Sequence, residues 1–192
     1  MRLHPLTISG CWLVDADEHR DTRGSFARVF CDQELRSSGL EARVAQVNAS
    51  WNERRGTLRG LHVRDATNPE CKLVRVTRGR AYDVLVDVRP GSSTWGCWEA
   101  VELDDRSHRA VWVCEGVAHG FLTLVDDVEV LYLHNRPHAP RAETGYRWDD
   151  PAFGISWPFA PKVLSERDTA WAPARRPVEQ ALAIAPASGG AR

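Results

Sequence analysis

The chain has 192 residues, 43% of them hydrophobic, and a formal net charge of −1. This length and composition fit one domain with a sizeable core, and the balanced charge argues against nucleic acid as a partner, since binders of polyanions normally carry a basic excess. No apolar run approaches the ~18 residues of a membrane span, and the start, MRLHPLTISG, lacks the apolar stretch of a signal peptide. Neither a membrane partner nor secretion is therefore expected.

The number and spacing of the cysteines indicate the redox state of the cellular compartment in which the protein resides. They are odd in number and show no CxxC spacing, which argues against a disulfide framework and against a zinc knuckle. We expect reduced thiols in a cytoplasmic protein at all five positions: Cys11, Cys31, Cys71, Cys97 and Cys114.

Short alternating or apolar segments predict β-strands along most of the chain. A strand is expected at 6–14, a charged turn at 15–24 and a strand at 25–30. The one convincing helix is predicted at 32–39, with Asp32 as its N-cap and Gly39 at its end. Further strands are predicted at 44–49, 58–63, 72–76, 81–88, 97–103, 110–113, 120–124 and 129–134.

Many short strands separated by turn residues are typical of a sandwich or barrel, and here they predict a jelly roll. Residues 149–161, rich in Pro, Gly and Trp, are expected to form an ordered cover. We predict a single domain over residues 1–172, followed by an Ala/Pro/Arg-rich, weakly ordered tail at 173–192.

Residues 56–79 place a histidine and a lysine on two neighbouring predicted strands. Strict alternation puts His62 on the face opposite Arg59, and it puts Lys72 on the same face as Val74 and Val76. A histidine beside a lysine in the mouth of a β-structure packs poorly. The pair does suit the removal of a proton from a carbon acid.

The same segments resemble the metal-binding positions of cupin barrels, which use an HxH pair, a glutamate at a fixed distance before a glycine, and a later Gly-x-x-His. Here the pair is His62-Val63-Arg64, and Lys72 stands at the glutamate position before Gly79. An arginine and a protonated lysine cannot ligate a cation and would repel it. We therefore predict fixed positive charge able to stabilise an oxyanion, and no metal site.

Each candidate residue also has a structural interpretation, which the sequence leaves open. His62 and His119 can be hydrogen-bonded core or turn histidines, Lys72 a surface lysine, and Tyr132 a core aromatic. Asp168 can be a loop acid or a helix N-terminus. Nearby glycines that permit close approach of a ligand favour a site at the histidines. The position of Lys72 at the start of an apolar strand argues against a solvated surface lysine.

A series of motifs then becomes specific in combination. In order over residues 21–168 they are DTRGSFARVF, VAQVNAS, TLRGLH, KLVRVTRG, YDVLVDVRPGSSTWGCW, EGVAHGF, LYLHNRPHAP, WDDPAFGISWP and LSERD. Together they resemble the dTDP-4-dehydrorhamnose 3,5-epimerase family. The resemblance implies an all-β, cupin-type jelly roll (a double-stranded β-helix) with short peripheral helices and without metal or cofactor. It also implies a homodimer with exchanged strands and a nucleotide-linked 4-keto-6-deoxy sugar as substrate.

The resemblance assigns roles to individual positions. His62 matches the general base, Asp168 the carboxylate that orients it, and Tyr132 the acid that returns a proton from the opposite face. Lys72 would stabilise the enolate at the 4-keto oxygen, with His119 beside it. The positions that would hold the diphosphate, sugar and nucleoside are Arg23, acting in the neighbouring subunit's site, and Gln46, Asn48, Arg59, Glu143 and Arg167.

Several positions depart from the family's pattern. RGLH is followed by Val63-Arg64 in place of an aromatic residue and Gln, Arg28 replaces a Glu that contacts the nucleotide, and His138 stands where a Tyr stacks on thymine. We retain Arg28 and His138 as substrate-binding candidates, since an imidazole can also stack on a base. The departures concern nucleotide recognition and the mouth of the pocket.

The predicted function is epimerisation at carbon 3, carbon 5 or both of a dTDP-4-keto-6-deoxyhexose, in rhamnose or specialised deoxysugar biosynthesis. Two alternatives remain: a 3,4-ketoisomerase of a nucleotide sugar, and a sugar-nucleotide-binding protein without turnover. Retention of Tyr132 favours inversion over a same-face proton shuttle. The joint presence of His62, Asp168 and Tyr132 favours catalysis over binding alone.

Overall fold

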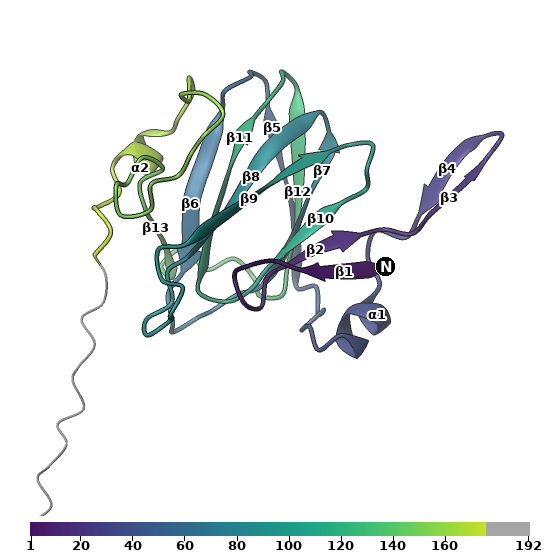
Figure 1. The fold of residues 1–192 in the computed structure, drawn as a ribbon, viewed down its shortest axis with the longest axis horizontal. Helices are drawn as coiled ribbons and strands as arrows, with labels where there is room; N and C mark the ends of the chain where they lie inside the picture. The colour runs from purple at the N-terminus through teal and green to yellow at the C-terminus, as the bar shows by residue number, and fades with distance from the viewer. Residues whose placement is uncertain (176–192) are drawn as a thin grey trace, which may run out of the picture.

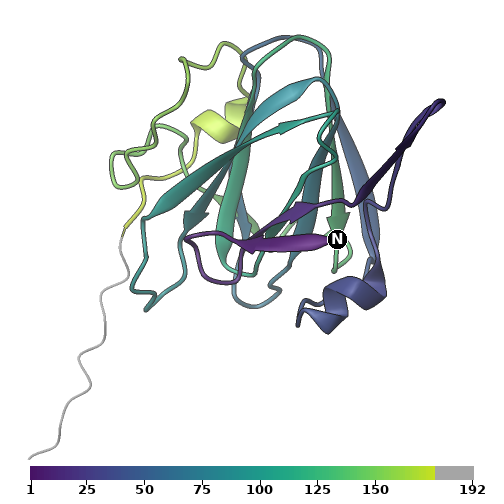
Figure 2. The ribbon, with the colours of Figure 1, turned by 45° about the vertical axis from the view of Figure 1, so that its right-hand side comes forward.

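Residues 1–175 are described by the computed structural model, and they contain thirteen strands and two short helices. Most strands belong to two antiparallel sheets, drawn in Figures 1 and 2. The predicted all-β jelly roll is confirmed. The predicted tail lies, from residue 176 onward, outside the described residues.

The larger sheet has the strand order β1-β2-β10-β7-β12-β5, with bounds Arg2–Pro5, Trp12–Asp15, Ala110–Val113, Lys72–Arg78, Val128–His134 and Gln46–Asn52. The smaller sheet has the order β13-β6-β11-β8-β9, with bounds Glu143–Gly145, Leu58–Arg64, Val117–Thr123, Arg80–Asp87 and Trp98–Asp104. Neighbours in each sheet that are far apart in sequence, such as β7 beside β12, are typical of jelly-roll connections.

The core lies between the two sheets, where their inward side chains form one cluster. Val74 and Val76 of β7 pack there with Leu85 of β8 and Phe121 of β11, and all four are at most 1% exposed. The outward face of β8 is buried as well, because Phe153 packs against Val84 and Val86. The predicted cover at 149–161 is thus confirmed, and β8 is buried along most of its length because both of its faces are covered.

A two-stranded hairpin of β3 (Glu18–Asp21) and β4 (Gly24–Ala27) projects from the body of the molecule, as Figures 1 and 2 show. Phe26, on this hairpin, is 74% exposed. Helix α1 (Asp32–Ser37) follows, and α2 (Glu166–Thr169) lies beside β6 near the end of the described chain. Neither helix is long and apolar enough to cross a membrane, within the range that the structure describes.

The N-terminal predictions need correction. A turn separates β1 from β2 where one strand was expected at 6–14, since Cys11 N–H donates to the Ile8 carbonyl and Gly10 has φ +86°. The expected turn at 15–24 contains β3, and the strand expected at 25–30 ends at Ala27. The N-cap of α1 is Cys31, so Asp32 lies in the first turn, and the helix ends at Ser37. The short, polar β13 has no predicted counterpart.

Candidate active site

A cavity is lined by side chains of both sheets. The smaller sheet contributes residues of β6 and β11, and the larger one contributes residues of β5, β7 and β12. Among the predicted site residues, those that line the cavity are Gln46, Asn48, Arg59, His62, Lys72, His119, Tyr132, His138 and Glu143. Side chains from distant parts of the sequence therefore meet at one place.

His62 and Asp168 form a hydrogen-bonded pair in which the carboxylate is buried and the imidazole side chain is 28% exposed. Nε2 of His62 lies 2.7 Å from Oδ1 of Asp168, whose residue is only 3% exposed. The N-cap Ser165 accepts a hydrogen bond from the Asp168 backbone, and the Gly60 N–H donates to Oδ2 at 3.3 Å, so the carboxylate is fixed from two sides. Burial pushes the pKa of Asp168 upward, but hydrogen bonding and the charge of His62 hold it below its ordinary value.

This pair decides which ring nitrogen of His62 is available. An ionised Asp168 accepts the Nε2–H, so the lone pair of the neutral imidazole resides on Nδ1. Oε1 of Glu143 is 4.0 Å from Nδ1. The ring of Trp171 packs edge-on against His62, with ring centroids 6.4 Å apart. The imidazole is thus oriented by its surroundings, which a general base requires.

A bulge in β6 brings Arg59 to the same cavity as His62. His119 of β11 is paired with His62, but Phe121, only two residues further along, is paired with Arg59, so β6 carries one extra residue. The expectation that Arg59 faces away from His62 is therefore wrong. The bulge lies where Gly60 approaches Gly120 closely: a Cβ built on Gly60 would be 2.5 Å from the Gly120 Cα.

Tyr132 reaches the cavity from the other sheet. It lies on β12, and its hydroxyl is 3.0 Å from the Ser50 hydroxyl on the neighbouring β5. Burial raises the pKa of Tyr132, so the phenol is protonated at neutral pH. Its ring also packs edge-on against that of His119, with centroids 6.5 Å apart. A proton donor therefore stands on the wall opposite the His62–Asp168 pair.

His119 is a buried, neutral neighbour of this site. Its Nε2 is 2.9 Å from Oδ2 of Asp83 on β8, and both residues are at most 3% exposed. Burial lowers the pKa of His119, although the Asp83 carboxylate opposes the shift. Asp83 was missed from the sequence. The available signal was a carboxylate inside the otherwise apolar segment DVLV, where alternation turns it inward beside Leu85.

Lys72 begins β7 at the cavity wall. Burial lowers the pKa of Lys72, and the carboxylates of Glu70, Asp83 and Glu143 act in the opposite direction. The predicted shared face is confirmed, since Lys72 lines the cavity while Val74 and Val76 enter the core between the sheets. An ammonium group with little solvent around it interacts strongly with an oxyanion.

A second polar cluster on the cavity wall was not predicted. Glu70 Oε2 lies 2.9 Å from Nε of Arg64 and 3.2 Å from Nδ1 of His134. Arg64 also donates to the Pro137 carbonyl at 2.9 Å. The sequence singled out Arg64 only as a departure from the family's pattern. Its partner Glu70 could have been found as the one acid immediately preceding the apolar strand of Lys72.

The remaining predicted residues fall into two groups. Gln46 accepts from the His138 backbone at 2.6 Å and donates to Asn48 at 2.9 Å, and Arg167 pairs with Glu143 at 3.0 Å. Arg23 and Arg28 do not line the cavity of their own chain. Arg23 lies on the β3–β4 hairpin and pairs with Asp21, while Arg28 pairs with Glu34 of α1.

The described side chains around the cavity do not form a set of metal ligands. Over residues 1–175, no group of three or more His, Cys, Asp and Glu side chains is arranged to hold a metal ion. At the cavity, His62 and His119 are each hydrogen-bonded to their own aspartate, and Lys72 stands close by.

Comparison with known proteins identifies the family of this chain. The model of the dTDP-4-dehydrorhamnose 3,5-epimerase family matches residues 5–175. A dTDP-4-dehydrorhamnose 3-epimerase of Streptomyces niveus is 40% identical over 88% of this chain and 81% of the relative. A dTDP-4-dehydrorhamnose 3,5-epimerase of Methanothermobacter thermautotrophicus is also 40% identical, over 88% of this chain and 92% of the relative.

A solved structure shows the same fold. The dTDP-4-dehydrorhamnose 3,5-epimerase of Bacillus anthracis, crystallised with TDP and PPi bound, superposes with a TM-score of 0.87 at 30% identity, covering 90% of this chain and 99% of that one. The family match over residues 5–175 includes every site residue predicted from the sequence. The chain belongs to the dTDP-4-dehydrorhamnose 3,5-epimerase family.

Proposed function

We propose that the protein is an isomerase that inverts carbon 3 of a dTDP-4-keto-6-deoxyhexose, alone or together with carbon 5, in deoxysugar biosynthesis. One observation supports this most directly: an oriented imidazole and a protonated phenol line one cavity from opposite sheets. Inversion needs a proton removed from one face of a carbon and returned to the other. The relatives named above are a 3-epimerase and 3,5-epimerases, and carbon 3 is common to both names.

The chemistry starts from the acidity that a ketone gives to a neighbouring carbon. His62 Nδ1 takes the proton from that carbon, the C–H bonding pair becomes the C=C bond of an enolate, and the negative charge moves to the 4-keto oxygen. Asp168 stabilises the resulting imidazolium by accepting its Nε2–H. Tyr132 then donates its proton to the opposite face of the carbon, and solvent resets both groups.

The enolate oxygen needs a fixed positive or hydrogen-bonding environment. Lys72 is the lysine on the cavity wall, and His119 is held beside it by Asp83. Such preorganised groups in a low-dielectric site commonly provide a larger share of catalysis than proton transfer alone. We therefore assign Lys72 to the oxyanion, with His119 as its neutral neighbour.

The nucleotide part of the substrate would lie toward the mouth of the cavity. Arg59 and Arg167 offer guanidinium groups suited to a diphosphate, and His138 offers a ring for the base. Gln46 and Asn48 supply amide groups on β5. The relative crystallised with TDP bound supports a thymidine nucleotide.

We further propose a cytoplasmic homodimer in which the β3–β4 hairpin reaches the partner's site. The hairpin projects from the body (Figure 2), and Phe26 on it is 74% exposed. The edge strand β5 carries Val47 and Trp51, which are 55% and 43% exposed, and such an apolar edge favours pairing with another chain. Arg23 would then bind the diphosphate in the neighbouring site. A monomer in light scattering, or an Arg23→Ala variant with unchanged KM, would contradict this.

Proton NMR in heavy water with dTDP-4-keto-6-deoxyglucose tests the proposed function. The wild type is expected to incorporate deuterium at carbon 3 and to show whether carbon 5 follows. His62→Ala should abolish exchange at every carbon while dTDP binding, measured by calorimetry, stays within about twofold. Exchange by His62→Ala at the wild-type rate would remove it as the base. A carbonyl that moves to carbon 3 would identify a ketoisomerase instead.

A further inference from the structure

Outside the cavity, two cysteines that are distant in sequence meet beside an arginine. Sγ of Cys11 lies 3.5 Å from Sγ of Cys114, and neither residue lines the cavity. We propose that Cys11 and Cys114 form a dithiol that hydrogen peroxide converts to an intramolecular disulfide, which links the β1–β2 turn to the β10–β11 turn. This site is independent of the proposed epimerase chemistry.

The sheet register explains why the two sulfurs meet. β10 pairs antiparallel with β2, with Trp112 opposite Trp12, so the chain just after β10 runs beside the chain just before β2. Gly10 leaves room at this point, because a Cβ on it would lie 3.1 Å from the Cys114 sulfur. Both cysteines lie in or next to turns, where a small backbone movement can close the sulfur–sulfur distance to the ~2.0 Å of a disulfide.

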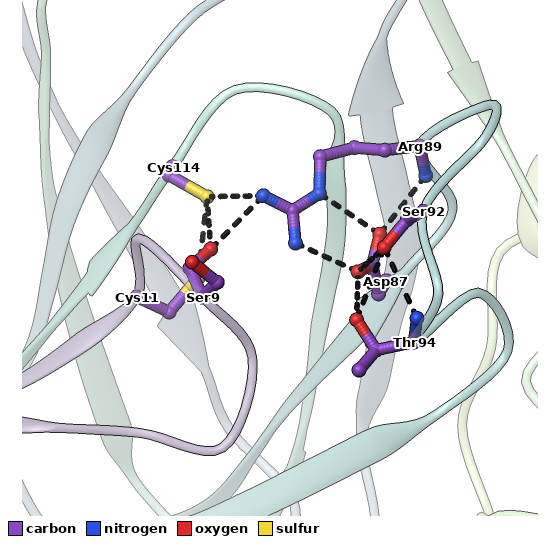
Figure 3. A network of polar contacts seen from close by, with 7 residues as sticks. All are labelled: Ser9, Cys11, Asp87, Arg89, Ser92, Thr94 and Cys114. Atoms are coloured by element: carbon purple, nitrogen blue, oxygen red, sulfur yellow. Dashed lines mark hydrogen bonds and ion pairs between the residues drawn. The ribbon is translucent and has the colours of Figure 1, made fainter.

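Arg89 makes Cys114 the more reactive thiol. Its Nη1 lies 3.8 Å from the Cys114 sulfur, and Figure 3 shows the guanidinium between Cys114 on one side and Asp87 on the other. Two hydrogen bonds to Asp87, of 2.9 and 2.7 Å, hold the guanidinium in place. The hydrogen bond from Cys11 and the charge of Arg89 lower the pKa of Cys114, whereas that hydrogen bond and burial raise the pKa of Cys11.

Exposure supports the same order of events. Cys114 is partly exposed, whereas Cys11 is 1% exposed, so peroxide meets Cys114 first. The Cys114 thiolate attacks one peroxide oxygen and the O–O bond breaks, which gives a sulfenic acid and a hydroxide ion. The hydroxide takes up the proton that the Cys114 thiol had released and becomes water. The Cys11 sulfur then attacks the Cys114 sulfur, the S–O bond breaks, and a second water leaves with the Cys11 proton. Two thiols and one peroxide thus give one disulfide and two waters.

Peptide mapping by mass spectrometry tests the proposal, because trypsin places each of the five cysteines in a different peptide. The full-length native protein is treated with hydrogen peroxide, alkylated and digested. We expect one cross-linked species joining peptide 3–20 to peptide 110–141, lighter by two hydrogens than the sum of the reduced peptides, and reversed by dithiothreitol. Peroxide treatment in urea should remove the preference for this pair.

Matched variants separate the steps. Cys97→Ser, which removes an exposed cysteine elsewhere, should leave the cross-link unchanged. Cys11→Ser should stop the reaction at a dimedone-reactive sulfenic acid on Cys114. Arg89→Gln should slow oxidation severalfold, while Arg89→Lys retains most of the rate. The proposal is overturned if Cys114 is over-oxidised to sulfinic acid while Cys11 stays alkylated, if other cysteines are linked instead, or if non-reducing gels show only intermolecular dimers.

Discussion

His62 and Tyr132 line the same cavity from opposite sheets, His62 on β6 of the smaller sheet and Tyr132 on β12 of the larger one. Neither residue is free to reorient. Asp168 bonds the imidazole at 2.7 Å, and Ser50 lies 3.0 Å from the phenol. This fixed opposition supports the proposal that one site removes a proton from one face of a sugar carbon and returns a proton to the other face.

Asp168→Asn is expected to lower kcat by about 10²- to 10⁴-fold, with KM and dTDP affinity changed little. The amide keeps the size of the side chain but cannot stabilise the imidazolium. Steady-state kinetics test this, with Glu166→Gln, an exposed acid on the same helix, as the control that should retain wild-type kcat. A kcat within threefold of wild type would show that Asp168 does not orient the base.

The same substitution should change how stability depends on pH. Asp168 has a folded-state pKa below the ordinary value of 3.8, so its contribution to stability is fully present above pH 3.8 and is lost as pH falls through the folded-state pKa. The gap in unfolding free energy between wild type and Asp168→Asn should therefore be constant at neutral pH and narrow below pH 3.8. Urea unfolding at a series of pH values measures the gap, and a gap that widens below pH 3.8 would show that the ionised Asp168 carboxylate does not stabilise the fold.

Lys72 should set the alkaline limit of activity. Burial lowers its pKa from 10.5, so the ammonium is lost at a pH below that of free lysine, whereas the raised pKa of Tyr132 keeps the phenol protonated to higher pH. Because the Glu70 carboxylate supports the charge on Lys72, Glu70→Gln should move the alkaline limb of kcat to lower pH, and Glu70→Asp should restore part of it. Lys162→Gln removes an exposed lysine that does not line the cavity, and as the control it should leave the alkaline limb of kcat unchanged. If the alkaline limb of the kcat profile does not shift in Glu70→Gln, Glu70 does not support the charge on Lys72.

Gly120→Ala should disturb the site through the β6 bulge. The added Cβ would lie 2.8 Å from the Arg59 carbonyl and 3.0 Å from Leu61 Cδ2, so β6 and β11 must separate. We expect a loss of about 1–3 kcal/mol in unfolding free energy, together with a fall in kcat as His62 moves. Gly91→Ala, where a Cβ meets nothing within 4 Å, should cost stability through its φ of +75° but leave kcat unchanged.

Alternation and turn residues predicted the strands from β7 to β12 well, because one face of each of these strands enters the core between the sheets. The same rule failed at Arg59, since an extra residue in β6 breaks the alternation. The glycine is the only residue of RGLH that indicates a bulge. It also failed at 6–14, where a turn of apolar residues resembles a strand.

Contacts between residues that are far apart in the sequence could not be predicted from local patterns. Asp168 is 106 residues from His62, and no local pattern brings α2 beside β6, so only the resemblance to the family joined them. Asp83 and Glu70 escaped notice because their roles depend on His119, Arg64 and His134, which reach them only through the sheet topology. The sequence predicts which residues share one face of a strand, whereas contacts between residues of different strands are known only from the fold.

The sharpest test is the ratio of deuterium incorporation to inversion in Tyr132→Phe, followed by proton NMR in heavy water. With His62 and Asp168 intact, the variant should still exchange the proton at carbon 3 while producing little or no inverted sugar, because the base can return a deuteron only to the face it served. Inversion at the wild-type rate in Tyr132→Phe would show that the second face is protonated by another group.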